Sequence, residues 1–293
     1  IDKDIERSLQ NIIKNIGDYN KVFIITQQSI INIYSSNELF SYGYHIIIAD
    51  EYELAKTMGE TEKIIDQLIN NGCTRDSILI GFGGGSVTDL TGFVASIFMR
   101  GIDHIFIPTT LLGMVDASIG GKTGVNTSKA KNVIGTINQP KAVCINPLYL
   151  KTLSKKDIIN GCAEIIKYGL ICNASLYKKI VLEFDNLIQL ENIDVIESII
   201  VICCQHKINF IIKDEFDTND RMKLNFGHTV GHAIESYFKY KNILHGEAVY
   251  YGMIAASYLS NKKGYLSDND FNKINNFITK IPKYNIENIN VYQ

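Results

Sequence analysis

Residues 77–89 read SILIGFGGGSVTD, an apolar run that passes directly into a cluster of glycines and then into a helical pattern. The first four residues have the composition of a buried strand. Glycines let backbone amides approach a phosphate closely, and the start of a helix favours an anion. The Rossmann fingerprint GxGxxG is absent, because it would need glycine at Ser86 or at Thr88. The stretch predicts a strand, a glycine turn and a helix, and the turn is either structural or phosphate-binding.

Similar apolar runs lie on both sides of this stretch. Residues 22–25 and 46–48 are predicted to form buried strands, and residues 105–107 form another that ends at Pro108. Apolar residues recur at helical spacing within residues 60–71. Strands that alternate with helices predict an α/β domain with a Rossmann-like, nucleotide-binding architecture.

The pattern changes near residue 150. The stretches 155–170 and 195–212 carry apolar residues every three or four positions, and strand-like runs largely disappear. We therefore predict two domains, an α/β nucleotide-binding domain over residues 1–150 and a mostly α-helical domain over residues 151–293.

Composition limits the partners and the location of the protein. The 293 residues are 46% hydrophobic, and 29 Lys and Arg against 31 Asp and Glu give a formal net charge of −2. No global cationic field favours nucleic acid or anionic lipid, so an anionic ligand must be held by local charges. No uninterrupted apolar run reaches the ~20 residues of a membrane helix, and the six cysteines form no CxxC pair. We expect a cytoplasmic protein with reduced thiols that binds neither nucleic acid nor membrane.

A second glycine pair is followed by a lysine, in Gly120-Gly121-Lys122-Thr123. The ATP-binding P-loop requires a further glycine five residues before Gly121, and Asp116 occupies that position. The sequence therefore argues against a P-loop ATPase.

Three of the six histidines lie within 18 residues of one another. His228 and His232 are four residues apart, so a helix places both on one face, and His245 follows. The segment 228–232 reads HTVGH and lacks the glutamate of the HExxH protease motif. This clustering fits a metal site and equally a polar interface between helices.

Glu164 is the candidate for a third metal ligand. It lies three residues before Lys167 in a helical pattern that is otherwise apolar. A catalytic zinc usually takes three protein ligands and keeps a fourth position open. Burial of either charge alone is unfavourable, so a metal, a charged ligand or the pairing of the two must compensate. Taken alone, the motif is explained more simply by an ion pair within a helix.

Seven motifs follow one another in the order found in the 3-dehydroquinate synthases, a family of sugar phosphate cyclases within the dehydroquinate synthase-like superfamily. They are residues 83–89, 99–101, 107–112, 121–126 and 131–132, the helix around Glu164, and residues 225–232. By this resemblance the chain is identified as a member of the family. The GGGxxxD form is similar to the NAD-binding loop that the family shares with iron-type polyol dehydrogenases. Residues 51–56 match family positions that contact the adenosine half of NAD, although alone they would be interpreted as a solvated helix start.

The resemblance implies two cofactors, NAD and zinc, with cobalt as an alternative metal. The implied metal ligands are Glu164, His228 and His245, and His232 is implied to relay protons. The implied NAD contacts are Glu53, Lys56, Gly84, Gly85, Asp89, Thr109, Thr110, Lys122, Lys131, Leu150, Lys151 and Thr152. The implied substrate contacts are Asp116, Lys122, Asn132, Lys167, Lys207, Arg221 and Asn225. Arg100 is implied to reach the phosphate site of a neighbouring subunit, so we expect a homodimer.

The family's reaction converts 3-deoxy-D-arabino-heptulosonate 7-phosphate into 3-dehydroquinate and phosphate. It is a phosphorus–oxygen lyase step of the shikimate pathway, which supplies chorismate and the aromatic amino acids. The resemblance implies transient oxidation by NAD, phosphate elimination, return of the hydride and aldol ring closure, so NAD acts as a catalyst.

Three alternatives stay open from the sequence. One is another sugar phosphate cyclase, one is an NAD-linked polyol dehydrogenase of the same superfamily, and one is a nucleotide-binding module without catalysis. The family also has a later lysine at its phosphate site, which we do not locate here. We expect the second domain to be incomplete at its C-terminal end, with Lys280 or Lys283 as candidate substitutes.

Overall fold

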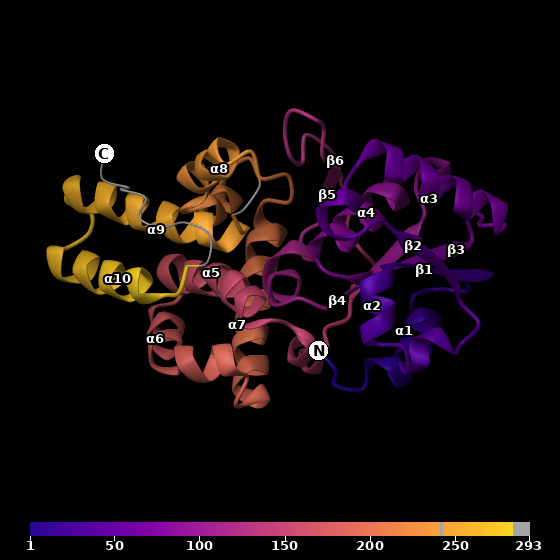
Figure 1. Ribbon diagram of the computed structural model, residues 1–293, viewed down its shortest axis with the longest axis horizontal. Helices are drawn as coiled ribbons and strands as arrows, with labels where there is room; N and C mark the ends of the chain where they lie inside the picture. The colour runs from indigo at the N-terminus through magenta and orange to yellow at the C-terminus, as the bar shows by residue number, and fades with distance from the viewer. Residues whose placement is uncertain (241–242, 284–293) are drawn as a thin grey trace. The chain divides into compact units, whose positions relative to one another are not determined.

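The computed structural model describes residues 1–240 and 243–283. The chain divides into two compact units, Ile1–Thr152 and Leu153–Gln293. The sequence places this boundary at residue 150. In Figure 1 the first unit is coloured from indigo to magenta, and the second continues through orange to yellow.

A five-stranded parallel sheet forms the centre of the first unit, in the order β2-β1-β3-β4-β7. Its strands are β1 (Lys21–Gln27), β2 (His45–Ala49), β3 (Ser77–Gly83), β4 (Asp103–Pro108) and β7 (Ala142–Val143). The direction of winding reverses between β1 and β3, and in such sheets ligands bind at the carboxyl ends of the strands at that point. The predicted Rossmann-like α/β fold is confirmed. The glycine loop follows β3, at the reversal.

Four α-helices belong to this unit, together with short 3₁₀ and π-helical segments. They are α1 (Ile5–Ile16), α2 (Gln28–Ile33), α3 (Met58–Asn70), α4 (Gly85–Ile97), η1 (Glu38–Phe40), η2 (Tyr52–Ala55), η3 (Phe98–Arg100), η4 (Gly113–Ala117) and η5 (Pro147–Thr152). The helix expected over residues 60–71 is α3. It begins after Thr57, whose hydroxyl accepts a hydrogen bond from the Glu60 amide. Its residues Ile64 and Leu68 are fully buried in the core of the unit.

The predicted burial of the strand at residues 46–48 is wrong in part. Ile46 and Ile48 are 39% and 44% exposed, whereas Ile47 is buried. β2 is the outer strand of the sheet and pairs only with β1, and one of its faces is open to solvent. A short apolar run does not distinguish a central strand from such an edge strand.

An antiparallel hairpin, β5 (Lys122–Val125) and β6 (Ile134–Ile137), is missing from the sequence prediction. Its strands are short and lack an alternating apolar pattern. Gly124 and Gly135 face each other across the pair, and a Cβ at Gly124 would lie 2.6 Å from the carbonyl oxygen of Ile134. The close backbone approach therefore depends on glycine.

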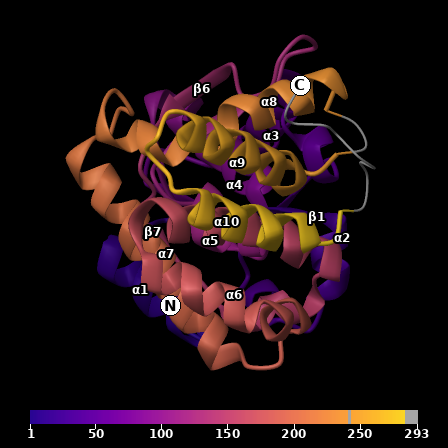
Figure 2. The same cartoon turned by 90° about the vertical axis from the view of Figure 1, so that its left-hand side faces the viewer.

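The second unit is helical, and no strand occurs in its described residues, 153–240 and 243–283. Its elements are α5 (Lys155–Cys172), α6 (Ala174–Gln189), α7 (Ile193–Lys213), η6 (Asp220–Asn225), α8 (His228–Tyr237), α9 (His245–Lys262) and α10 (Asp268–Lys280). Four of these helices begin at side-chain caps, which are Ser154, Asn173, Asn192 and Ser267. Figure 2 shows α9 and α10 side by side, and the two helices pack against each other. The predicted helical character of this part of the chain is confirmed.

Two glycines allow α8 and α9 to approach closely. Gly227 precedes α8 with φ of +82°, a conformation that glycine adopts without strain. A Cβ at Gly252 of α9 would lie only 1.8 Å from the carbonyl oxygen of Gly227. Any larger residue at position 252 would therefore push the two helices apart.

Helix α7 is long and apolar enough, by length and composition, to cross a membrane. About 33% of its apolar window is buried, including Ile196, Ile199 and Ile200, and one such helix is weak evidence of a membrane span. All six cysteines are free thiols.

Candidate active site

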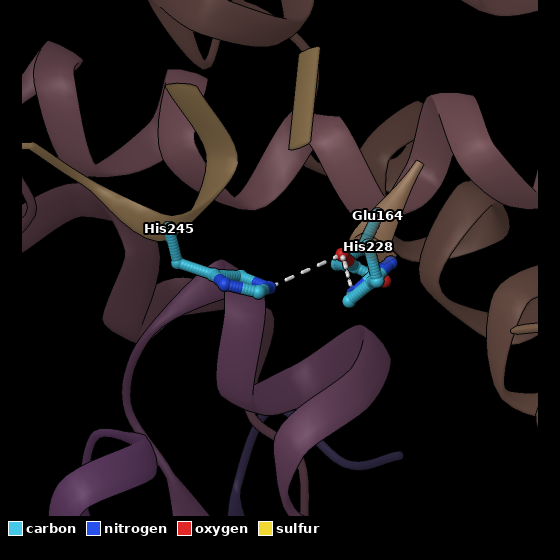
Figure 3. Close-up of side chains that lie close together, drawn as sticks. All are labelled: Glu164, His228 and His245. Atoms are coloured by element: carbon cyan, nitrogen blue, oxygen red, sulfur yellow. Dashed lines mark ion pairs between the residues drawn. The ribbon is translucent and has the colours of Figure 1, made fainter. Parts of the chain in front are cut away.

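Three metal-binding side chains meet in the second unit. Glu164 lies on α5, His228 is the first residue of α8 and His245 is the first residue of α9. Their ligand atoms all lie within 4.8 Å of one another, and we refer to these three residues as the metal cluster. Oε1 of Glu164 lies 3.4 Å from Nε2 of His228 and 3.6 Å from Nε2 of His245. Dashed lines mark these two pairs in Figure 3.

Contacts between α5 and α9 hold this arrangement. The amide of Gly246, next to His245, donates a hydrogen bond to Oδ1 of Asn160 on α5 at 2.6 Å. A Cβ at Gly246 would lie 2.2 Å from the carbonyl oxygen of Asn160, so α9 begins in direct contact with the helix that carries Glu164. The hydroxyl of Tyr250 donates to the carbonyl of Ile159 one turn further along α9.

The electrostatics of the cluster centre on Glu164, which is fully buried. Lys167, 2% exposed, forms an ion pair with its Oε2 atom. Burial would raise the pKa of Glu164, but the ammonium of Lys167 and the two imidazoles outweigh burial and hold that pKa well below its usual value. Burial would lower the pKa of His245, but the carboxylates of Glu164 and Glu235 raise it to about 9.

The geometry of the cluster fits a four-coordinate metal. Zinc with bonds of roughly 2.0–2.1 Å in tetrahedral geometry holds its ligand atoms about 3.3 Å apart. The separations of 3.4 and 3.6 Å are close to this value. Oε2 of Glu164 pairs with Lys167, and Oε1 has no hydrogen-bond partner within the described parts of the chain. One carboxylate and two imidazoles are also the donor set of many catalytic zinc sites.

Each histidine of the cluster has an acceptor near its second ring nitrogen. Nδ1 of His228 lies 3.2 Å from the carbonyl oxygen of Phe226. Nδ1 of His245 lies 3.6 Å from Oε1 of Glu235, which is 5% exposed. The sequence analysis missed Glu235. The sequence does contain one indication of this residue, because Glu235 lies seven residues after His228 and therefore two turns along the same helix face.

His232 lies beside the cluster, with its ring centroid 5.4 Å from that of His228 and 6.2 Å from that of His245. Burial, followed by the charge of the His228 imidazole, lowers the pKa of His232. Potential metal-binding atoms of His232, Glu235 and His245 also lie within 4.8 Å of one another. A neutral imidazole at this position can accept and return a proton near neutral pH.

The other predicted site residues of this unit include two further buried cations. Lys207 on α7 is 6% exposed, and Arg221 on η6 is 3% exposed. The guanidinium of Arg221 donates to the carbonyl of Glu215. The elements α5, α7 and η6, which carry Lys167, Lys207 and Arg221, contact one another, and the exposed Asn225 ends η6.

The glycine loop of the first unit forms the start of α4. Gly84 precedes the first turn in an extended conformation, and the amide of Thr109 donates to the carbonyl of Gly83. A Cβ at Gly84 would lie 3.1 Å from Cγ2 of Thr110. A Cβ at Gly85 would lie 3.4 Å from the side chain of Ala117 on η4. The predicted loop residues 84, 85 and 110 are thus in contact, with backbone amides at a helix start.

Charged and amide side chains form a network beside this loop, which we call the nucleotide network. Its members are Glu53, Lys56, Asp89, Lys131 and Asn132. Nζ of Lys56 lies 2.6 Å from Oδ2 of Asp89 and donates to Oδ1 of Asn132 at 2.6 Å. Oε1 of Glu53 lies 3.6 Å from Nζ of Lys131. Lys56 is only 4% exposed, so the interpretation of this lysine as part of a solvated helix start is wrong.

The network sets the charge states of its members. Burial would lower the pKa of Lys56, but the carboxylates of Asp89 and Glu53 raise that pKa above its usual value. Burial would raise the pKa of Glu53, but the ammonium groups of Lys56 and Lys131 lower it. At neutral pH both signs of charge are therefore present beside the loop.

The remaining predicted residues of the first unit lie on β5 and on the short helical segments η3, η4 and η5. Lys122 is exposed at the start of β5, Asp116 is half-buried on η4, and Arg100 is exposed at the end of η3 with φ of +68°. The turn of Leu150, Lys151 and Thr152 belongs to η5, where Leu150 is buried. The hydroxyl of Thr152 hydrogen-bonds with that of Tyr34 at 2.7 Å.

Both halves of the chain match one protein family. Residues 46–160 match the family described as 3-dehydroquinate synthase N-terminal, and residues 161–291 match the one described as 3-dehydroquinate synthase C-terminal. The chain belongs to the 3-dehydroquinate synthase family. The predicted resemblance is confirmed.

Curated members of the 3-dehydroquinate synthase family are similar over most of the chain. The 3-dehydroquinate synthase of Streptococcus pneumoniae is 41% identical over 87% of this chain and 72% of its own length. That of Thermoanaerobacter pseudethanolicus is 42% identical over 93% of this chain and 78% of its own. That of Dictyoglomus thermophilum is 44% identical over 88% and 72%.

Solved structures related to the 3-dehydroquinate synthase family share the fold. A 2-epi-5-epi-valiolone synthase from Streptomyces hygroscopicus, solved with NAD+ and Zn2+ bound, has a TM-score of 0.83 at 27% identity and covers 89% of this chain and 75% of its own. A 2-deoxy-scyllo-inosose synthase has a TM-score of 0.84 at 24% identity, over 95% of this chain and 76% of its own, and at that identity indicates the fold alone.

Lys283, a candidate substitute for the later lysine of 3-dehydroquinate synthases, lies just after the end of α10. Its Nζ donates to the carbonyls of Ile278, Thr279 and Ile281 at the end of α10. Its ammonium also lies 5.7 Å from the ring centroid of Tyr251. Lys283 therefore caps a helix.

Proposed function

We propose that the chain is a 3-dehydroquinate synthase, a phosphorus–oxygen lyase. It converts 3-deoxy-D-arabino-heptulosonate 7-phosphate into 3-dehydroquinate and inorganic phosphate, in the shikimate pathway of aromatic amino acid biosynthesis. The observation that carries the proposal is the metal cluster in a chain whose two halves both match this family.

The cofactors are NAD and a divalent metal, zinc or cobalt. Glu164, His228 and His245 hold the metal. A tetrahedral ion with three protein ligands has a fourth position for a substrate oxygen. When bound, the metal would supply a Lewis acid for a substrate hydroxyl, and NAD would supply a reversible hydride acceptor for the carbon that carries this hydroxyl. Relatives of the same fold are solved with these cofactors, one with NAD+ and Zn2+ and one with NAD+ and Co2+.

Buried cations of the second unit bind the anionic groups of the substrate. The phosphate and the carboxylate together carry several negative charges, while the whole chain carries only −2. Lys167, Lys207 and Arg221 are each at most 6% exposed, so their charges act in a medium of low dielectric where they attract an anion strongly. Asn225 and the first-unit residues Asp116, Lys122 and Asn132 complete the predicted substrate contacts.

His232 transfers protons. Its pKa is lowered, so the ring is neutral at physiological pH and can accept a proton from a substrate hydroxyl. Its place beside the two histidines of the metal cluster suits that role.

The first unit binds NAD through the glycine loop and the nucleotide network. Backbone amides at Gly84 and Gly85 would bind the pyrophosphate, because these residues lie at the start of α4, where the helix dipole favours an anion. Glu53 and Lys56 bind the adenosine half, and Asp89, Thr109, Thr110, Lys131 and residues 150–152 provide the other predicted NAD contacts. The protein is cytoplasmic and works as a homodimer in which Arg100 of one protomer serves the phosphate site of its partner.

A product analysis tests this function. The protein is incubated with the heptulosonate phosphate, zinc and an amount of NAD far below that of the substrate. We expect 3-dehydroquinate and inorganic phosphate in equal amounts, many turnovers per NAD, and no net NADH.

Controls separate this activity from its rivals. Metal-free protein and the His228→Ala variant should release no phosphate, and zinc or cobalt should restore release only to the former. Net NADH with glycerol would favour a polyol dehydrogenase. Failure to consume the heptulosonate phosphate, with turnover of another sugar phosphate, would assign a different cyclase.

A further inference from the structure

The imidazole of His245 lies between two buried carboxylates. Its Nε2 atom is 3.6 Å from Oε1 of Glu164, and its Nδ1 atom is 3.6 Å from Oε1 of Glu235. Glu164 is fully buried and Glu235 is 5% exposed. Figure 3 shows the ring extended from the start of α9 toward Glu164. The ring orientation is thus constrained from both of its nitrogen atoms.

A neutral imidazole carries its proton on only one nitrogen. A metal at Nε2 requires the proton on Nδ1, and a carboxylate next to Nδ1 stabilises that tautomer. The separation of 3.6 Å is an ion-pair distance, and closing it by less than about 1 Å makes a charge-assisted hydrogen bond. His228 has the equivalent arrangement with a neutral acceptor, the carbonyl oxygen of Phe226 at 3.2 Å from its Nδ1.

Glu235 could instead be a ligand itself, because its carboxylate groups with His232 and His245. A cation bound there would use Nδ1 of His245, and the proton would then occupy Nε2, which faces Glu164. One neutral ring cannot serve both positions. The group that contains Glu164 has the more buried carboxylate and the donor separations of tetrahedral zinc, so Nε2 is the metal-binding atom.

We propose that Glu235 is a positioning residue of the metal site, whose carboxylate accepts a hydrogen bond from Nδ1–H of His245 and so presents the unprotonated Nε2 atom to the cation. The inference rests on the proposed function, because the cation is the one assigned there to the metal cluster. Acceptors of this kind typically contribute about 10–100-fold to metal affinity.

Two substitutions of Glu235 distinguish the effect of losing the acceptor from the effect of losing the negative charge. Glu235→Ala removes the acceptor, and we expect about 10–100-fold weaker zinc binding. Glu235→Gln keeps the size and one acceptor oxygen but removes the charge, so its loss should be smaller. Ser236→Ala is the matched control, because Ser236 is the exposed neighbour on the same helix, and its zinc affinity should equal that of the parent.

The experiment is a zinc titration of metal-free protein in competition with a chromophoric chelator, without substrate or NAD. The visible spectrum of the cobalt-substituted protein gives a second readout, because it changes when the orientation of a ligand changes. Thermal unfolding of the metal-free variants shows whether each is folded. If Glu235→Ala does not fold, Glu235→Gln decides by the same two readouts.

Parent-like zinc affinity and a parent-like cobalt spectrum in a folded Glu235→Ala variant would overturn the positioning role. If the parent and this variant bind zinc equally while His228→Ala does not, the proposed function survives and the role of Glu235 does not. A parent protein that binds no zinc would overturn both.

Discussion

At the scale of single residues, burial decides which charges need partners. Glu164 and Lys167 are both buried on α5, and the sequence predicts their compensation because charged residues in an apolar helix stand out. Glu235 lies in a helix with an ordinary amphipathic pattern, so its burial follows only from the packing of α8 against α9. The residues of the metal cluster were therefore predictable by residue type and family resemblance, whereas the only sequence signal of Glu235 is its spacing of seven residues from His228.

His104 on β4 illustrates a buried residue with a pH effect on stability. It is 1% exposed, and its Nε2 atom has no hydrogen-bond partner within the described residues. Burial lowers its pKa from 6.5 to about 4. The unfolded chain therefore takes up a proton between these values while the folded protein does not, and the free energy of unfolding falls as pH drops from about 6.5 to about 4.

We expect this histidine to destabilise the protein by up to about 3 kcal/mol at the acid end of that range. His104→Phe should lose less stability between pH 7 and pH 5 than the parent, measured as the free energy of unfolding in urea. His45→Phe, at a half-buried position of β2, serves as the control. An identical loss in the parent and in His104→Phe would show that His104 does not titrate in this way.

At the scale of elements, periodicity located the long helices and the buried strands, but tertiary contacts set the rest. β1, β3, β4, α3, α5 and α7 were predictable because apolar residues repeat along them. The β5–β6 hairpin has no such repeat and forms by the close approach of two glycine backbones. The exposure of β2 follows from its place at the edge of the sheet, which no local pattern encodes.

The contact between α8 and α9 should affect the metal cluster, because each of these helices begins with a histidine of the cluster. Gly252→Ala would place a methyl group 1.8 Å from the carbonyl oxygen of Gly227, so the two groups would overlap. We expect a loss of about 2–3 kcal/mol in the free energy of unfolding, together with weaker zinc binding, because both histidines shift.

Gly59→Ala provides the comparison. Gly59 lies in α3, and a Cβ there meets only the Thr57 hydroxyl at 4.0 Å. This variant should change stability by less than about 1 kcal/mol and leave zinc affinity unchanged. Parent-like stability and zinc affinity in Gly252→Ala would show that the helices separate without disturbing the cluster.

At the scale of the whole molecule, the two units divide the chemistry. The first is a parallel α/β unit with a glycine loop at the point where the strand order reverses, and the second is a helical unit that holds the metal cluster. A change from strand and helix alternation to helices alone is visible in the sequence, so the architecture was predictable. The near-zero net charge hides the buried cations, because charge counts do not report position.

In the proposed function, one carboxylate and two imidazoles of the second unit bind a single metal ion. The most direct measurement is an anomalous difference map at the zinc absorption edge, from crystals of the protein grown with zinc. We expect one strong peak with bonds of roughly 2.0–2.2 Å to a carboxylate oxygen of Glu164 and to Nε2 of His228 and His245. A zinc peak held by other residues, or those three side chains apart from one another with no metal between them, would contradict the account.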